Sequence, residues 1–213
     1  MPRARTLMIA TLLGLPAAAG AQRRDDSGGG ERAWFASASA GIQFGPLVLD
    51  DASSSRWDID AAFSWRATVE RAVSPGVTAG LAFSHARLPM TYVSTAASSS
   101  CARCAADVTV SSYGGIVRVG PGSARGFHQV LEVFVGALRY GNFEQVSPRG
   151  RLAPASNTDF AFGAGYGFAY AIGNDYAIQL VQDAVNALHE RSTQGGGRLA
   201  RHLSTRLGVR VGF

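Results

Sequence analysis

Apolar and polar residues alternate along most of this chain with a period of two. The clearest segment is 199–213, where one face carries mainly leucine, valine and phenylalanine and the other carries small or polar residues. Side chains of a β-strand point alternately to its two sides, so this pattern predicts a strand with one apolar face. Seven further segments show the same period: 33–47, 56–73, 77–88, 107–119, 127–140, 158–172 and 176–188.

The connections between these segments are alternately long and short. A short one is Ser74-Pro75-Gly76, in which proline fixes a backbone angle and glycine tolerates positive φ. The long ones are polar or rich in small residues and cover 50–55, 89–106, 141–157 and 191–197. In an up-and-down arrangement, the short turns and both ends of the chain then lie on one side of the barrel. The sequence therefore predicts an all-β fold of eight antiparallel strands.

The face opposite the apolar one decides between a soluble barrel or sandwich and a transmembrane barrel. It consists mostly of glycine, alanine and serine, which cover a water-facing surface poorly but fit the narrow interior of a small barrel. The apolar face suits lipid, and a closed barrel leaves no backbone group unpaired. We therefore predict an eight-stranded antiparallel up-and-down transmembrane β-barrel over 33–213. Aromatic residues near the strand ends are expected to form interfacial girdles: Trp34, Trp57, Tyr92, Tyr140, Tyr170, Tyr176 and Phe213.

The N-terminus indicates export. Arg3 and Arg5 precede a short apolar stretch, 7–15, and Ala19-Gly20-Ala21 offers a cleavage site of small residues. We expect a signal peptide over 1–21 and a flexible leader over 22–32. All twenty basic residues are arginines and the pI is about 9.8. Because these arginines are scattered through the alternating segments and form no patch, the sequence argues against binding of nucleic acid.

These features together resemble the OmpA-like and OmpW-like outer-membrane β-barrel proteins, which are porin-like in architecture. The resemblance rests on the signal peptide, the eight alternating strands, the short turns and long outer loops, and the terminal V-R-V-G-F. It implies a location in the outer membrane of a Gram-negative cell and contact with outer-membrane lipid and lipopolysaccharide. It also implies that the barrel-assembly machinery reads the last strand through Phe213, and that the protein is a monomer.

Charged residues on the inward face are expected to form a network in the lumen. An eight-stranded barrel encloses space just wide enough for side chains, so charges there must be paired or hydrated. The network residues are Asp60, Arg66, Glu70, Glu132, Asp183, Arg206 and Arg210. Asp58, Arg118 and His202 are expected on the same inward face. A salt-bridged plug is one interpretation, and a gated polar path for ions or small solutes is the other.

Two short motifs invite chemical interpretations. His202 and Ser204 share a face and are similar to the His-x-Ser pair of lipid A deacylases, but that face is the predicted lumen and no acid follows Glu190. Cys101 and Cys104 form C-x-x-C, which we interpret as a loop disulfide, with free thiols or metal binding as alternatives. His85 and His189 are expected near strand ends, in contact with solvent.

The sequence therefore predicts an outer-membrane barrel with no enzymatic role, cofactor or metal. Its function is expected to lie in envelope integrity or in surface recognition through the outer loops. A narrow channel for small solutes is the first alternative, and a lipid A-modifying enzyme is the second.

Overall fold

The computed structural model describes residues 33–97, 99–120, 125–172, 175–190 and 198–213. The predicted signal peptide and leader lie outside the described residues. Eight long antiparallel strands form the wall of the barrel. They are β1 (Trp34–Phe44), β4 (Ala62–Ser74), β5 (Val77–Ser94), β6 (Arg103–Val119), β7 (Gly126–Gln145), β9 (Ser156–Ile172), β10 (Tyr176–Leu188) and β11 (Leu199–Gly212).

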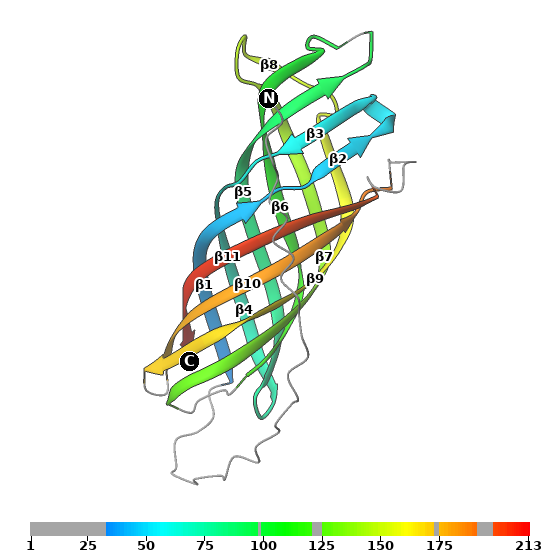
Figure 1. Cartoon of the computed structure of the whole chain (residues 1–213). Coiled ribbons are helices and arrows are strands. Elements are labelled where there is room, and N and C mark those ends of the chain that lie inside the picture. The colour runs from blue at the N-terminus through cyan, green and yellow to red at the C-terminus, as the bar shows by residue number, and fades with distance from the viewer. Residues whose placement is uncertain (1–32, 98, 121–124, 173–174, 191–197) are drawn as a thin grey trace, which may run out of the picture. The chain divides into compact units, whose positions relative to one another are not determined.

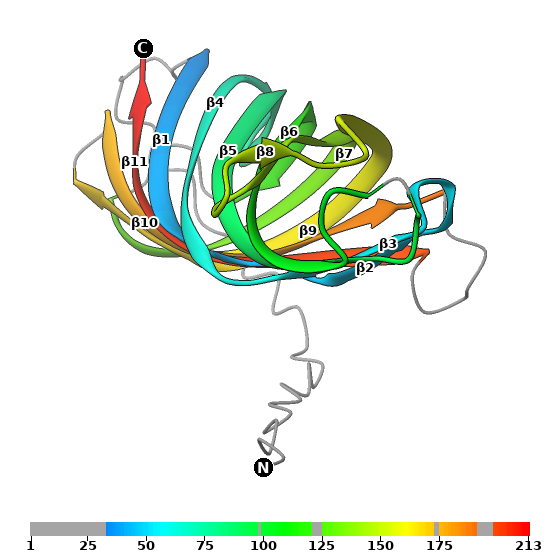
Figure 2. The same cartoon turned by 90° about the horizontal axis from the view of Figure 1, so that it is seen from above.

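The barrel closes through its first strand. β1 pairs with β11 on one side and with β4 on the other, so that Ser37 lies opposite both Arg210 and Thr68. Each remaining strand pairs with its neighbours in sequence. Figure 2 shows β1 between β11 and β4. The predicted eight-stranded antiparallel barrel is confirmed.

The end of the barrel opposite the short turns carries additional structure. Between β1 and β4 lies a hairpin made of β2 (Leu47–Asp50), a 3₁₀ turn η1 (Asp51–Ser53) and β3 (Ser55–Ile59). The short strand β8 (Gly150–Arg151) pairs with β7 at the same end (Figure 1). No helix among the described residues is long and apolar enough to cross a membrane.

Four strands are much longer than a membrane requires, since about 9–11 tilted residues cross the hydrocarbon layer. β9 has 17 residues, close to its predicted length, whereas β5, β6 and β7 have 18, 17 and 20 residues and exceed their predicted lengths. The predicted strand ends at 88, 107 and 140 were therefore wrong. The structure continues β5 to Ser94, begins β6 at Arg103 and continues β7 to Gln145. The outer parts of these strands project beyond the membrane.

The polarity of these strands inverts where they leave the membrane, which is why the predicted strands end too early. On β5, outward Leu81 and Phe83 are exposed and apolar, but two residues beyond His85 the outward residue is Arg87. The inward face changes in the opposite sense, from Ser84 to a buried Leu88. The alternation continues, but its apolar phase moves to the other face.

The second predicted strand, 56–73, is interrupted. Asp60 and Ala61 belong to neither β3 nor β4, and the buried positions change from odd numbers in β3 to even numbers in β4. Trp57 is therefore fully buried, whereas Phe63 is 65% exposed on the outward face. Gly45 permits the close approach of β3, since a Cβ there would lie 2.2 Å from Cγ2 of Ile59.

The break and the inversion also correct the predicted aromatic girdles. Trp57, Tyr92 and Tyr140 are buried inside the molecule. The other four predicted girdle residues are exposed on the outward face, near the end that carries the short turns: Trp34, Tyr170, Tyr176 and Phe213.

Candidate functional site

Seven charged side chains fill the half of the lumen near the short turns, and we call them the lumen network. Arginines and acids alternate along it in the order Arg66, Asp183, Arg206, Glu132, Arg118, Glu70, Arg210. The nitrogen–oxygen distances of these ion pairs, other than that between Arg206 and Glu132, lie between 2.7 and 3.2 Å. Because the members come from β4, β6, β7, β10 and β11, the network ties together strands from opposite walls.

The structure brings together six of the seven residues expected in the network. The seventh, Asp60, is exposed at the break between β3 and β4 and lies outside the lumen. Arg118, expected only as an inward charge, bridges Glu132 and Glu70. Asp58 lies on the face of β3 opposite buried Trp57.

Each acid of the network contacts two arginines, and two of the three acids accept from hydroxyl groups as well. The hydroxyls of Thr68 and Thr78 donate to Glu70 at 2.6 and 2.5 Å, and that of Ser204 donates to Asp183 at 2.5 Å. The side chains of the network are between 0 and 11% exposed. Removing one partner of such a buried pair costs about 3–5 kcal/mol, because an uncompensated charge remains.

Glycines of β9 provide the space for these large side chains. Gly163, Gly165 and Gly167 face the lumen at the level of the network. A Cβ at Gly165 would lie 3.1 Å from the Cβ of Asp183. The inward glycines of this strand, which the sequence pattern places opposite its aromatic face, thus leave room for the ion pairs.

The opposite half of the molecule has an apolar interior, which we call the outer core. Its largest fully buried side chains are Trp57, Tyr92, Tyr140, Phe143 and Leu88. The ring of Trp57 lies 4.7 Å from that of Phe143 and 5.5 Å from that of Tyr140, measured between centroids. The β2–β3 hairpin therefore packs against the inner face of the long strands. The hairpin, the outer parts of β5, β6 and β7, and β8 form the outer extension.

Local hydrogen bonds shape the hairpin that carries Trp57. The carboxylate of Asp50 accepts from the backbone N–H of Ala52 and from the hydroxyl of Ser53. Ser54 adopts the left-handed conformation, with φ of 50°, and closes the turn. The indole N–H of Trp57 donates to Ser55 at 2.8 Å. The buried indole thus has its polar atom satisfied, as such residues require.

The predicted His202–Ser204 pair is not assembled as a catalytic dyad. The two ring nitrogens of His202 contact the amide of Gln43 at 3.1 Å and the hydroxyl of Tyr140 at 2.8 Å. Ser204 instead donates to Asp183. A serine nucleophile needs a base within hydrogen-bond reach, and Ser204 lacks this contact here.

The two histidines that were expected near strand ends, His85 and His189, differ from that expectation. His189 is fully buried in the outer core, where its Nδ1 lies 2.8 Å from the carboxylate of Asp159. His85 lies within β5 on the outward face, beside Trp65, and its Nδ1 is 3.0 Å from the hydroxyl of Ser111. The His85–Ser111 pair has no signal in the sequence, because the two residues meet only through the register of β5 and β6.

Cys101 and Cys104 are joined by a disulfide that links the loop after β5 to the second residue of β6, with their Cα atoms 6.1 Å apart. Among the described residues, no group of three or more His, Cys, Asp or Glu side chains could hold a metal ion.

A charged groove lies on the water-facing side of the outer extension. Its cavity volume is about 570 Å³, within the range of ligand-binding clefts. Arg87 lines the groove and forms ion pairs of 3.1 Å with Asp107 and Glu144. Arg149 and Arg151, both exposed, also line the groove. The groove is therefore a polar surface with two arginines available to a partner.

Comparisons with known proteins support the fold. No protein-family model matches the chain, and no curated protein matches its sequence. Among solved structures, it is similar to Neisserial surface protein A, with 14% identity over 84% of this chain and 97% of that chain and a TM-score of 0.57. It is also similar to the outer membrane protein OprG from Pseudomonas aeruginosa, with 12% identity, coverage of 86% and 98%, and a TM-score of 0.53.

Identity at this level shows a shared fold. The location follows from that fold together with the outward band of exposed apolar residues on all eight wall strands, which suits contact with lipid. The chain therefore has the fold of the eight-stranded outer-membrane β-barrels, and it lies in the outer membrane.

Proposed function

We propose that the protein is a non-conducting outer-membrane barrel that anchors a folded outer extension for recognition at the cell surface. The observation that carries this proposal is the outer core. The outer extension has a buried apolar interior and a polar exterior, as a water-soluble domain does, so it holds its loops in a fixed arrangement. Binding sites are often loops positioned by a rigid scaffold of this kind.

The filled lumen supports the non-conducting part of the proposal. The lumen network and the outer core lie in series along the barrel, and both are almost fully buried. We infer that neither half offers a continuous water-filled path. A narrow channel, the alternative function, is tested by measuring conductance in planar bilayers. We expect no conductance steps from bilayers into which folded, heat-modifiable barrels have been inserted. Regular conductance steps would contradict the closed barrel.

The charged groove is the surface that we propose for recognition. A deletion strain of the source bacterium should be complemented with the wild-type protein and with an Arg149→Ala, Arg151→Ala variant. We expect the variant to restore resistance to detergent but to lose adhesion to surfaces and host cells. Arg71→Ala, an exposed arginine at the opposite end of the barrel, is the matched control. If the groove variant adheres like the wild type, the groove is not the recognition surface.

A lipid-modifying enzyme is the second candidate, and the outward His85–Ser111 pair favours it. A base 3.0 Å from a serine at the lipid surface could activate that serine. We rank this candidate lower because no carboxylate among the described residues is hydrogen-bonded to His85 to orient it. Mass analysis of lipid A exposed to the wild-type protein and to Ser111→Ala would identify such an activity. An unchanged lipid A spectrum with the wild-type protein is the expected result.

We further propose that the barrel is a monomer in contact with lipopolysaccharide, and that the assembly machinery recognises its last strand. The support is the exposed aromatic Phe213, whose backbone pairs with Trp34 of the first strand at 2.9 Å. Deleting Phe213 should slow assembly in cells while leaving refolding in detergent unchanged.

A further inference from the structure

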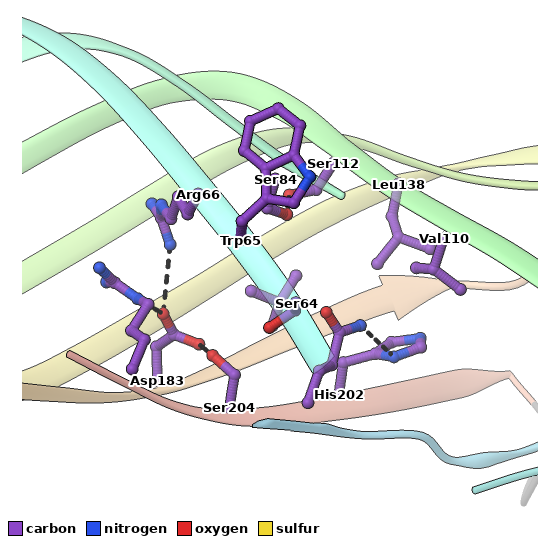
Figure 3. A pocket seen from close by; sticks show the side chains of 13 residues that line it. Ser64, Trp65, Arg66, Ser84, Val110, Ser112, Leu138, Asp183, His202 and Ser204 are labelled. Carbon is purple, nitrogen blue, oxygen red and sulfur yellow. Dashed lines mark hydrogen bonds and ion pairs between the residues drawn. The ribbon is translucent and has the colours of Figure 1, made fainter. Parts of the chain in front are cut away.

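A small cavity lies in the lumen between the lumen network and the outer core. Its volume is about 30 Å³. Figure 3 shows Arg66, Asp183 and Ser204 toward one end of this cavity and Val110 and Leu138 toward the other. Its polar wall includes the hydroxyl groups of three further serines, Ser64, Ser84 and Ser112. The cavity thus has charged, hydroxyl and apolar walls.

Arg66 is one of the residues that line this cavity, and its guanidinium group has two hydrogen-bond donors without a partner in the described part of the chain. Its Nη1 contacts Asp183 at 3.2 Å, but its buried Nε and Nη2 have no hydrogen-bond partner among the described residues. The Arg66 residue as a whole is 7% exposed. Buried donors on a charged group are costly to leave unsatisfied, so a ligand or water is expected beside them.

The lumen network carries one positive charge in excess. It contains four arginines and three acids, and it begins and ends with an arginine. The nearest further inward acid on β9 is Asp159, six residues from Gly165 and so about 20 Å along the strand. Asp159 is already bonded to His189 and Asn157. It therefore does not neutralise the network locally.

The other polar groups at the cavity repel an anion only weakly, because the one carboxylate among them is already paired with arginines. The carboxylate of Asp183 is held by two guanidinium groups, of Arg66 and Arg206, and by the hydroxyl of Ser204. Ser84 and Ser112 share one hydrogen bond of 2.6 Å, which leaves the second hydroxyl hydrogen of the pair free to donate. Arg66, Ser84 and Ser112 lie in one cross-strand row of β4, β5 and β6.

We propose that this cavity binds one small monovalent anion, of the size of chloride. A water needs about 10–15 Å³ of such volume, so the cavity holds a halide and at most one water but no sulfate or phosphate. Arg66 supplies the charge and two donors, and the serine pair supplies a third donor. The anion completes the charge balance of the lumen, which makes it a structural part of the barrel interior. This site does not depend on the recognition role proposed for the outer extension.

The experiment is to refold the protein in sodium bromide, crystallise it and collect anomalous diffraction data at the bromine edge. We expect a bromide peak inside the cavity, within contact distance of Arg66 and of the Ser84–Ser112 pair. A cavity that holds only water, with no anomalous peak, overturns the proposal. Bromide found only at surface arginines overturns it as well.

Substitutions test which residues hold the bromide that gives the anomalous peak. Arg66→Gln, which removes the excess charge, should lose the peak, whereas Arg139→Gln removes an outward arginine and should keep it. If Arg66→Gln does not fold, as judged by the absence of a heat-modifiable band, Ser84→Val decides the question. This variant fills the cavity with methyl groups and should exclude bromide without altering any charge. An undiminished peak in either folded variant contradicts the assignment.

Discussion

The barrel wall and the outer extension are built from the same strands with opposite polarity. In the membrane, β5, β6 and β7 present apolar side chains outward, such as Leu81 and Val133, and polar or charged ones inward, such as Glu132. In the outer extension the inward residues are apolar, such as Leu88, and the outward ones are polar, such as Arg87. Period-two alternation alone therefore defines a strand, but the surrounding solvent decides which face must be apolar.

The polarity of the outward face changes at a single row of paired residues between the barrel wall and the outer extension. Trp65, His85, Ser111 and Arg139 lie opposite one another on successive strands and all point outward. The next outward row toward the short turns contains Phe83 and is apolar. This row places an indole, an imidazole, a hydroxyl and a guanidinium at one level, as expected at a membrane–water interface. It marks the outer boundary of the membrane band.

The largest effect is expected in the lumen network. Glu132→Ala removes the acid that contacts both Arg206 and Arg118, so two buried guanidinium groups lose a partner. We expect a loss of about 3–5 kcal/mol in the free energy of unfolding, measured by urea titration in micelles. Glu144→Ala, which removes an exposed acid paired with Arg87, is the control and should cost about 0–1 kcal/mol. Equal losses for the two variants would contradict the buried network.

The next largest effect is expected from a charge placed on the outward face of the barrel wall, compared with the same charge on the outward face of the outer extension. Val133→Arg places a charge near the middle of the membrane band on β7 and should cost about 2–4 kcal/mol. Ala105→Arg places the same charge on the outward face of β6 in the outer extension, where water solvates it, and should change stability little. Urea titration in lipid vesicles measures both. A large cost for Ala105→Arg would mean that the membrane band extends further than we describe.

Trp57→Ala is expected to loosen the outer extension rather than the barrel. The cost should reach at most about 3 kcal/mol, the lower limit for removing a buried tryptophan, because the hairpin can open without unfolding the wall. Limited proteolysis should cleave the variant within 45–61 while the heat-modifiable barrel persists. Trp65→Ala, which removes an exposed tryptophan of β4, serves as the control. Loss of the heat-modifiable band would show that the hairpin is part of the barrel's own stability.

The smallest effect is expected at the junction between the two regions. Tyr140→Phe removes the hydroxyl that contacts Nε2 of His202 at 2.8 Å and leaves the ring packing unchanged. We expect a loss of about 1 kcal/mol by urea titration. No measurable change would mean that water replaces the hydroxyl at this position.

The fold and most of the lumen network could be predicted from the sequence because the alternation keeps one phase within the membrane band. Arg66, Glu132 and Arg206 lie in such stretches, so their inward orientation follows from counting residues. Asp60 lies at the break between β3 and β4, where the phase shifts by one residue, and its placement was wrong for that reason. The outer core could not be predicted, because its strands alternate as regularly as the wall and only the membrane boundary reveals the inversion.

The contacts between individual side chains also could not be predicted from the sequence. The role of Arg118 as the bridge between two acids and the pairing of His85 with Ser111 depend on register across neighbouring strands. Register is fixed by the closure of the barrel and by bulges such as the one between Asp107 and Thr109. Neither barrel closure nor a bulge of this kind can be recognised from a short sequence motif.

The inversion itself is tested most directly by spin labels on the two outward faces. Single cysteines at Val133 and Ala105, in a Cys101→Ser, Cys104→Ser background, should be labelled in vesicles and compared for collisions with oxygen and with a water-soluble nickel complex. We predict that the label at Val133 collides mainly with oxygen, which dissolves in lipid, and that the label at Ala105 collides mainly with the nickel complex. Two labels with the same lipid-type accessibility would contradict an extension that stands in water.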